Sequence, residues 1–253
     1  MPEPVYIISD THLGAASPDV ERALLGFLRA LRGRASTLVV NGDLFDFWFE
    51  WKTVIPRGAF KTLGALSELR ESGTAIIWVA GNHDCWGGEV LRDDLGVDYR
   101  MEAWEGQLAG WRARIEHGDG LREREDKAYR RLRTVLRSPL SIRLFRFLHP
   151  DFATRIATAT SHTSRDYRAR DEGTGLRAVA HAALTADPGL DLLVYAHSHV
   201  AMLERVGRGV YANAGSWLDA PTYLSLSERS IELHQWDGSL DSTALSSLER
   251  SAT

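Results

Sequence analysis

The sequence predicts an α/β fold in which helices cover a parallel sheet. Short apolar runs rich in Val and Ile, which are typical of buried strands, alternate with longer segments whose apolar residues recur at helical spacing. In addition, residues that can bind metal ions directly follow several of the predicted strands. Open α/β sheets bind their ligands at that carboxyl edge, so the two observations support one another.

The first half of the chain predicts a regular alternation of strands and helices. Residues 5–9 are mostly apolar and β-branched, which favours a buried strand. Apolar residues at helical spacing predict a helix over 18–31, with Ser17 as its N-cap and Pro18 in its first turn. Three more elements continue the alternation: a strand over 37–41, a helix over 60–72 that ends before Gly73, and a strand over 74–80.

The second half predicts a hairpin, a helical segment and a run of strands. Residues 97–116 have the pattern of a β-hairpin that leads to His117. Residues 122–170, called the lid segment below, are rich in Arg and predict short helices broken at Pro139 and Pro150. The later elements are a helix over 176–186, a strand over 190–195, and antiparallel strands over 201–206, 209–212, 222–225 and 230–236.

Five short blocks hold residues that can bind metal ions. They are Asp10-Thr11-His12, Gly42-Asp43-Leu44-Phe45-Asp46, Gly81-Asn82-His83-Asp84, His117-Gly118-Asp119 and His197-Ser198-His199. Each block alone is a weak signal, because Gly-Asp and Asn are common in turns. Five such blocks at strand ends hold more ligands than one ion needs. Carboxylates, an amide and imidazoles without a thiolate suit two ions of Mn²⁺, Fe or Zn²⁺ better than copper, and a binuclear hydrolase is the leading hypothesis.

The spacing within the blocks fits shared metal ions. Asp10 and His12 are two residues apart, so in extended geometry both side chains point to the same side, and His197 and His199 repeat this arrangement. Asp43 offers a carboxylate that can bridge two cations about 3.5 Å apart, with a shared water between them. The remaining candidate ligands are the amide of Asn82 and the imidazole of His117.

These blocks resemble the motifs of the calcineurin-like metallophosphoesterase superfamily, which are D-x-H, G-D-x-x-D, G-N-H-D/E, a lone His and G-H-x-H. The resemblance covers residues 5–217 and departs at Ala196, where the family usually has Gly. It implies a four-layer αββα sandwich with a helical lid insertion. It also implies one ion held by Asp10, His12, Asp43 and His199, and a second held by Asp43, Asn82, His117 and His197.

The same resemblance implies a catalytic role for His83. In the family the matching residue lies beside the metal-bound phosphate and stabilises the leaving group or the transition state. An imidazolium can donate to a developing phosphate oxygen, which makes this role physically sound. Asp84 follows directly and is expected to orient His83, while Asn82 and His83 are expected to contact the substrate.

The lid segment is strongly basic in an acidic chain. It holds 13 Arg and Lys against 5 Asp and Glu, whereas the whole chain carries a net charge of −4, and this asymmetry predicts an anionic partner. The lid segment resembles that of UDP-2,3-diacylglucosamine diphosphatases, lipid A pathway hydrolases that cut the pyrophosphate of a nucleotide-linked diacyl sugar at the membrane surface. This resemblance implies that Asp126, Tyr129 and Arg130 contact the substrate.

Two features leave the substrate open. The apolar residues of the lid segment could bind acyl chains and touch an anionic bilayer, or they could simply pack on the core. His83 stands where the best-known members of the diphosphatase group have Arg. The alternative is therefore a phosphodiesterase or phosphatase that acts on soluble nucleotides or other small phosphoesters.

Two further classes are less well supported. A binding scaffold without catalysis is disfavoured because every motif keeps its ligands. A nuclease is not expected, since no aromatic stacking platform accompanies the basic segment, and we expect no nucleic-acid partner.

The bulk composition predicts one soluble domain over residues 1–253. No run of about 18 apolar residues is present, so no transmembrane helix is expected. The first residues lack the pattern of a signal peptide, and the single cysteine, Cys85, excludes an intrachain disulfide. The expected location is the cytoplasm, with peripheral contact to the inner face of the membrane through the lid segment. The sequence leaves the oligomeric state undetermined.

Overall fold

The computed structural model describes residues 4–123, 125–157 and 173–251, and within these residues the strands form two sheets. The first sheet has seven strands in the order β12-β11-β10-β1-β2-β3-β4. Four of its strands run parallel, β1 (Val5–Ile8), β2 (Thr37–Asn41), β3 (Ala75–Val79) and β4 (Asp98–Arg100). Three are added antiparallel at the β1 edge, β10 (Thr222–Leu226), β11 (Ser230–Gln235) and β12 (Ser246–Glu249).

The second sheet has five strands in the order β5-β6-β7-β9-β8. Its members are β5 (Trp104–Leu108), β6 (Trp111–Ile115), β7 (Leu192–Tyr195), β8 (Met202–Val206) and β9 (Gly209–Asn213). β6, β7 and β9 run parallel, so their carboxyl ends lie at one edge.

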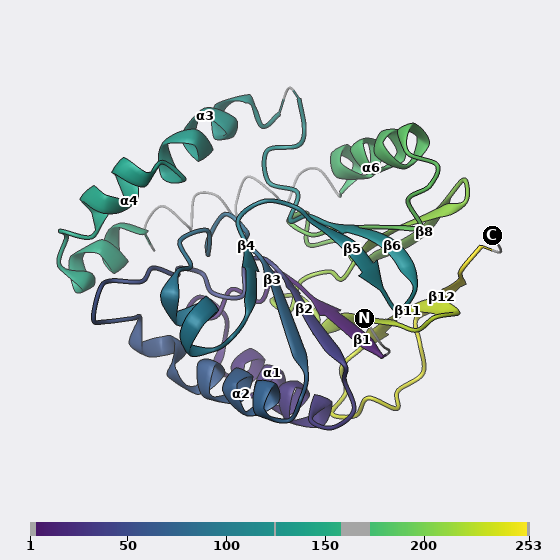
Figure 1. Ribbon diagram of the computed structural model, residues 1–253, viewed down its shortest axis with the longest axis horizontal. Coiled ribbons are helices and arrows are strands. Elements are labelled where there is room, and N and C mark those ends of the chain that lie inside the picture. The colour runs from purple at the N-terminus through teal and green to yellow at the C-terminus, as the bar shows by residue number, and fades with distance from the viewer. Residues whose placement is uncertain (1–3, 124, 158–172, 252–253) are drawn as a thin grey trace.

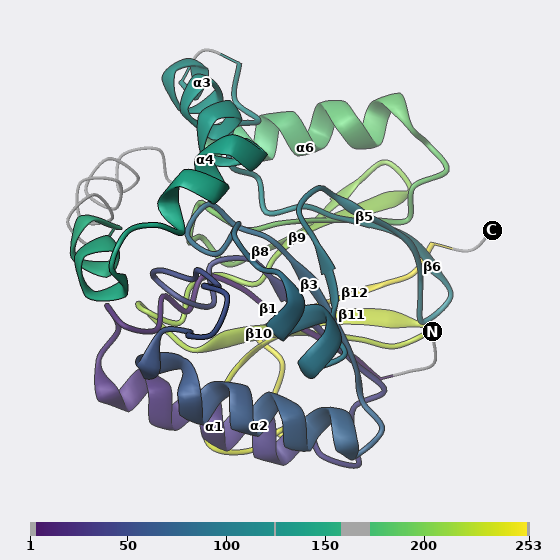
Figure 2. The same ribbon diagram turned by 60° about the vertical axis from the view of Figure 1, so that its left-hand side comes forward.

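Helices cover the outer faces of the two sheets (Figures 1 and 2). α1 (Pro18–Leu31) and α2 (Phe60–Glu71) lie on the first sheet, and α6 (Thr174–Ala186) lies on the second. Strand β1 shows how the layers form, because Tyr6 and Ile8 pack in the core with α1 and α2 while Val5 and Ile7 pack in the core between the sheets. The resulting αββα sandwich confirms the predicted fold class.

Some predicted elements match closely and others need correction. α1 has the predicted bounds, with Pro18 in its first turn. The predicted hairpin over 97–116 is wrong in part, because β4 joins the first sheet beside β3 and only β5 and β6 form the hairpin. Its turn places Ala109 and Gly110 at φ values of 45° and 83°, a tight turn that the backbone twist of paired strands favours. Strand β12 was not predicted.

The described part of the lid segment is helical. It contains α3 (Lys127–Leu136), α4 (Pro139–Phe145) and a helical stretch over 150–157, so two of its helices begin at the predicted proline breaks. Residue 124 and residues 158–170 of the lid segment lie outside the described residues. Across the described chain, no helix combines the length and the apolarity needed to cross a membrane.

Aromatic side chains fix the lid segment to the core. The ring of Phe145 lies 4.8 Å from that of Phe49 and 4.9 Å from that of Trp86, measured between centroids. The indole of Trp86 donates to the carbonyl of Leu136 at 2.8 Å, and that of Trp51 donates to the carbonyl of Leu148 at 3.2 Å. These contacts hold the lid helices beside the loops that follow β2 and β3.

Candidate metal centre

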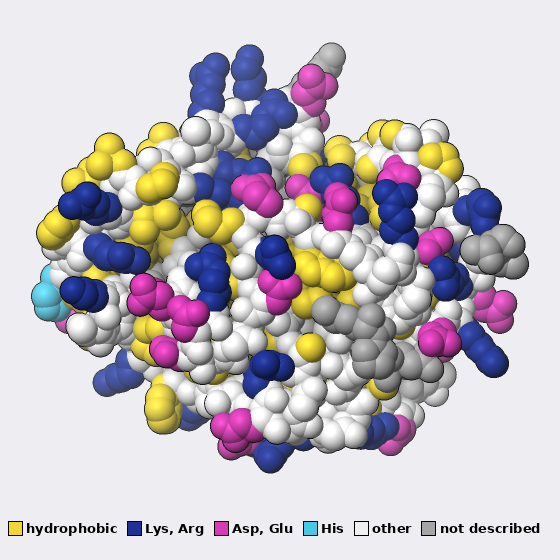
Figure 3. All heavy atoms as spheres, in the orientation of Figure 1, with side chains coloured by type: hydrophobic (Ala, Val, Ile, Leu, Met, Phe, Trp, Pro, Cys, Tyr) yellow, Lys and Arg dark blue, Asp and Glu magenta, His cyan; other side chains and the backbone are white. Residues whose placement is uncertain are grey.

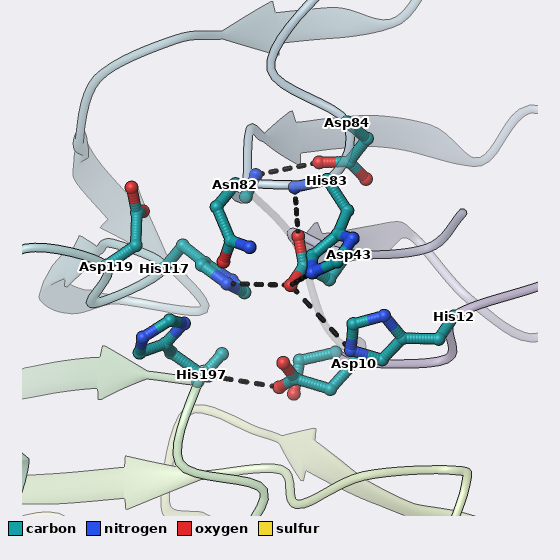
Figure 4. Close-up of polar contacts among 12 residues, drawn as sticks. Asp10, His12, Asp43, Asn82, His83, Asp84, His117, Asp119 and His197 are labelled. Carbon is teal, nitrogen blue, oxygen red and sulfur yellow. Dashed lines mark hydrogen bonds and ion pairs between the residues drawn. The ribbon is translucent and has the colours of Figure 1, made fainter. Parts of the chain in front are cut away.

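The five blocks meet where the parallel strands of both sheets end (Figure 4). The candidate ligands follow five different strands: Asp10 and His12 follow β1, Asp43 follows β2, Asn82 follows β3, His117 follows β6, and His197 and His199 follow β7. Both sheets therefore contribute to the same cluster, with Asp43 near its centre (Figure 4).

Two groups of possible ligands lie close enough to hold a metal ion. In the first group, Nε2 of His199 lies 3.4 Å from Oδ1 of Asp10 and 3.3 Å from Nε2 of His12. In the second group, Nε2 of His117 lies 3.3 Å from Oδ2 of Asp43, and His197 completes a set whose ligand atoms all lie within 4.8 Å of one another.

Asp43 links these two groups. Its Oδ2 lies 3.7 Å from Nε2 of His12 as well as 3.3 Å from Nε2 of His117. A third set with the same spacing consists of His12, Asp43 and His83, so the geometry allows His83 itself to approach an ion. The carboxylate of Asp43 can thus serve more than one ion at once.

Buried polar atoms in the cluster lack hydrogen-bond partners among the described residues. They include Oδ1 of Asp10, Oδ1 of Asn82 and Nε2 of His117. Leaving such an atom unsatisfied costs about 1–3 kcal/mol, and more for a charged group. A divalent cation would satisfy all three atoms, and the mixed oxygen and nitrogen donor set is of the kind that Mn²⁺, Fe or Zn²⁺ accepts. The residues present therefore fit the metal ions that the motifs imply.

The backbone of the ligand-bearing loops is strained. Five candidate ligands have positive φ angles, between 48° and 63°: Asp10, His12, Asp43, His197 and His199. Non-glycine residues rarely adopt this left-handed conformation, which costs of order 1–3 kcal/mol each and collects at functional sites. Among the described non-glycine residues only Ala109, in the β5–β6 turn, shares it. The surrounding fold therefore stabilises these five residues in backbone conformations that are unfavourable for them in an isolated chain.

Glycines at 42 and 81 allow the loops to approach closely. A Cβ atom at Gly42 would collide with the ring of His117 and with the backbone of Gly81, and a Cβ atom at Gly81 would collide with Asp43. Gly42 also has φ 79°, which favours glycine. The second and third blocks therefore need glycine to place Asp43 beside Asn82.

Hydrogen bonds orient the imidazole rings. Nδ1 of His117 lies 2.9 Å from the carbonyl oxygen of Asn41, so Nδ1 carries a proton and Nε2 is turned toward Asp43, 3.3 Å from its Oδ2. Nδ1 of His83 lies 2.8 Å from the carbonyl oxygen of Asp46, which orients its Nε2 in the same manner. Such contacts select the tautomer that a ligand or a proton donor needs.

Asp84 contacts the loop rather than an imidazole. Its carboxylate accepts hydrogen bonds from the backbone N–H of Gly81 at 2.7 Å, from that of Leu44 at 2.9 Å, and from the indole of Trp78 at 3.1 Å. Burial and the nearby charge of Asp43 raise the pKa of Asp84 to about 7. Asp84 therefore ties together the two loops that carry Asp43 and His83.

Asp43 keeps its negative charge despite complete burial. Burial raises the pKa of its carboxyl, but the surrounding imidazoles, that of His117 foremost, hold the pKa well below its usual value. The centre therefore holds a fixed anion between several imidazoles before any cation binds.

Two acidic residues of the blocks have contacts that the sequence did not assign. Oδ1 of Asp46 lies 3.4 Å from Nδ1 of His12 and 3.7 Å from Nδ1 of His83. Asp119 points away from the cluster (Figure 4) and accepts a hydrogen bond from the Tyr129 hydroxyl at 2.8 Å. Both residues stand in the predicted blocks, so the signal was present, but only the fold shows their partners.

The three lid residues predicted to contact the substrate differ in their surroundings. Asp126 pairs with Arg122, whose Nη2 lies 2.7 Å from its Oδ1, and Arg130 donates to the carbonyl of Glu123 at 2.6 Å. Tyr129 instead lines a cavity of about 370 Å³ between the lid segment and the metal centre. That cavity also contains Asp46, Phe47, Asn82, His83, Trp86, Leu132, Leu136, Ser141, Phe145, Ile156 and Ala157.

Comparisons with known proteins identify the family of the chain. The family model for calcineurin-like phosphoesterase matches residues 3–201. A UDP-2,3-diacylglucosamine hydrolase of Porphyromonas gingivalis is 36% identical over 64% of this chain, and the match spans 63% of that relative's length. A UDP-2,3-diacylglucosamine hydrolase of Pseudomonas savastanoi pv. phaseolicola is 28% identical over 95% of this chain and 99% of its own length.

A solved structure supports the fold alone. A crystal structure of a Vps29 double mutant from Entamoeba histolytica has a TM-score of 0.51 at 15% identity, and the likeness covers 98% of this chain and 99% of that one. From the family match and the clustered ligands, we conclude that the chain belongs to the calcineurin-like phosphoesterase family and is a hydrolase that uses divalent metal ions.

Proposed function

We propose that the protein hydrolyses the pyrophosphate bond of a nucleotide-linked diacyl sugar of the UDP-2,3-diacylglucosamine type. One observation carries this proposal: the cavity beside Asn82 and His83 is lined on its other side by apolar side chains of α3 and α4. A purely polar phosphoester gains no binding free energy from contact with these apolar side chains. An acyl chain gains about 0.8 kcal/mol of binding free energy for each CH₂ group that it buries. The names of the two relatives support the same substrate.

The metal ions would lie on either side of Asp43. We assign Asp10, His12, Asp43 and His199 to one ion, and Asp43, Asn82, His117 and His197 to the other. We propose Mn²⁺ as the native metal, because carboxylate, amide and imidazole donors together suit it. When bound, two divalent cations neutralise phosphate charge and make water a stronger nucleophile at neutral pH.

The residues around the cluster account for the remaining chemistry. A water attacks phosphorus, the bond to the bridging oxygen breaks, and the nucleoside monophosphate and the sugar phosphate separate. Asp46 fixes the ring of His83, whose Nε2 lies 4.0 Å from Oδ2 of Asp43, so His83 can deliver a proton to the departing oxygen. Asp84 holds the loop of Asn82 and His83 in place through its contact with Gly81.

The outer surface of the lid segment suits a membrane that presents the lipid. Its exposed apolar side chains outside the lid cavity are Val135, Leu140, Leu144, Phe147 and Phe152. Basic side chains lie among the apolar ones on this face (Figure 3). Apolar residues beside Arg residues bind anionic bilayers by burial and by charge attraction, so we propose peripheral contact through the lid segment.

His83 favours a second candidate. A histidine at this position suits protonation of an alcohol leaving group, which a soluble phosphodiester would release. Hydrolysis of small soluble phosphodiesters is therefore the alternative activity of the same centre.

One assay separates the two candidates. The Mn²⁺-loaded protein should release UMP from UDP-2,3-diacylglucosamine with a kcat/KM far above that for bis(p-nitrophenyl) phosphate. Leu132→Lys places a charge on the cavity wall and should lower kcat/KM for the diacyl substrate about tenfold or more. Leu245→Lys, at another exposed leucine outside the lid segment, is the control and should leave kcat/KM unchanged. Equal activity on the aryl ester, with no effect of Leu132→Lys, would favour the soluble substrate instead.

A further inference from the structure

A second cavity lies on the other side of Asp46 and Phe47. Its volume is about 680 Å³, larger than that of the lid cavity, and it separates the loop over 45–59 from the helical stretch over 150–157. Figures 1 and 2 both show this loop beside that stretch. The lining consists of Leu13, Gly14, Phe45, Asp46, Phe47, Trp51, Ile55, Pro56, Arg57, Gly58, Ala59, Pro150, Asp151, Thr154 and Arg155.

The two cavities adjoin at Asp46 and Phe47 but differ in chemistry. Asp46 and Phe47 line both, and the Asp46 carboxylate lies 3.4 Å from Nδ1 of His12. Among the described residues, no Lys or Arg lines the lid cavity, whereas two guanidinium groups, those of Arg57 and Arg155, line the second cavity. One cavity therefore suits an apolar chain and the other an anionic, polar group.

The two arginines are available for a ligand. Neither side chain has a recorded hydrogen bond or ion pair among the described residues, and both are exposed at the cavity wall. They approach from different elements, since Arg57 lies in the short helical turn Arg57–Ala59 and Arg155 in the stretch over 150–157. Guanidinium groups bind phosphate oxygens with strong, often bidentate hydrogen bonds, so each of these two side chains can bind an anionic group of a ligand in the cavity.

The remaining polar groups of the cavity suit a nucleoside. Asp151 is an acceptor for hydroxyl groups, and its side chain is 88% exposed. An isolated phosphate would be repelled by this carboxylate, whereas a ribose offers it two donors. Phe47 and Ile55 supply apolar surface on which a base can lie. The charge of Asp46 is directed toward His12 and His83 and so does not oppose an anion here.

We propose that this second cavity binds the nucleoside phosphate half of the substrate, while the lid cavity binds its acyl half. The inference rests on the proposed function, because it requires a substrate with an anionic nucleotide at one end and acyl chains at the other. The pyrophosphate then spans the metal centre, and Phe47 stands between the two halves. Arg57 and Arg155 determine specificity for the nucleotide.

Binding of UMP to the Mn²⁺-loaded protein tests the cavity without turnover. Titration calorimetry should show UMP binding that weakens about tenfold in Arg57→Gln and in Arg155→Gln, because each change removes charged hydrogen bonds to a phosphate. Arg143→Gln removes an exposed arginine of α4 that does not line the cavity, and should bind UMP like the unchanged protein. Inorganic phosphate should bind more weakly than UMP. Equal UMP affinity in all variants, or phosphate binding as tight as UMP binding, would overturn the inference.

Kinetics separate failure of this inference from failure of the proposed function. In the Arg57→Gln, Arg155→Gln double variant, the ratio of kcat/KM for UDP-2,3-diacylglucosamine to that for bis(p-nitrophenyl) phosphate should fall at least tenfold, mainly through KM. If the unchanged protein cleaves the diacyl substrate and the double variant has the same ratio, only the nucleotide cavity is wrong. If the unchanged protein cleaves the aryl ester but neither binds UMP nor cleaves the diacyl substrate, both proposals fail.

Discussion

The ring Nδ1 of His83 lies 2.8 Å from the carbonyl oxygen of Asp46. Since a carbonyl only accepts, Nδ1 must carry a proton, and Nε2 is left to face the metal centre. The backbone N–H of His83 in turn donates to Oδ1 of Asp43 at 2.8 Å. The residue proposed as proton donor is thus fixed by both acidic residues of the second block.

Replacement of His83 by Ala separates catalysis from metal binding. Loss of a proton donor should lower kcat by about 10²–10⁴-fold, while the metal content stays at two ions per chain. Metal analysis of the purified variant, together with steady-state kinetics, checks this. Loss of one ion in His83→Ala would instead show that His83 is a ligand, as its place within reach of His12 and Asp43 permits.

Replacement of Asp46 by Asn should weaken metal binding without removing it. The carboxylate lies 3.4 Å from Nδ1 of His12 and can orient that ring, and such supporting groups typically contribute 10–100-fold to metal affinity. Competition with a fluorescent chelator gives the affinity. Asp94→Asn, at an exposed acid outside the site, should leave the affinity unchanged. An unaltered Mn²⁺ affinity in Asp46→Asn would contradict this role.

Replacement of Tyr129 by Phe should loosen the lid segment. The hydroxyl donates to the buried carboxylate of Asp119, and loss of a hydrogen bond to a charged group costs about 1.5–3 kcal/mol. Arg133 and Arg137 still contact Asp119, so the fold should survive. Limited trypsin digestion should cut the lid segment faster in the variant than in the unchanged protein, which has the same cleavage sites. Equal rates would show that this contact does not hold the lid segment.

The ion pair between Arg177 of α6 and Glu204 of β8 should stabilise the fold less at acidic pH than at neutral pH. Hydrogen bonds from Arg177, at 2.7 Å from both carboxylate oxygens, lower the pKa of Glu204 to about 2. A lowered pKa in the folded state means that the pair stabilises the protein above the unfolded pKa of 4.5 and loses this effect as the pH falls toward 2. The melting temperature of Arg177→Met should therefore be lower than that of the unchanged protein at pH 7, and the difference should shrink by pH 3. A constant difference would contradict the pairing.

Patterns within a few neighbouring residues were enough to predict helix α1 and the buried parallel strands. Pro18 and the helical spacing of apolar residues define α1, and buried β-branched runs define the parallel strands. β12 was missed because Ser246–Glu249 is mostly polar and exposed, and pairs with β11 through its backbone. The role of β4 depends on its pairing with β3, which no pattern within Asp98–Arg100 reveals.

For the site as well, the sequence predicted which residues come together but not the contacts that depend on the folded loops. Motif order and strand ends predicted which residues would meet, since the carboxyl ends of parallel strands share an edge. The partners of Asp46, Asp84 and Asp119 could not be predicted, because each depends on which way a side chain turns in the folded loops. The second cavity lies between a loop and a helical stretch that are about a hundred residues apart in the sequence, so only the fold reveals it.

The metal content of the unchanged protein and of Asp43→Ala tests the central claim most directly. Asp43 lies in two of the three ligand groups, within 3.3 Å of His117 and 3.7 Å of His12. Plasma mass spectrometry should find two divalent ions per chain in the unchanged protein and a loss at both positions in Asp43→Ala, together with loss of hydrolysis. One ion per chain in the unchanged protein, or two ions retained in Asp43→Ala, would contradict a binuclear centre bridged by Asp43.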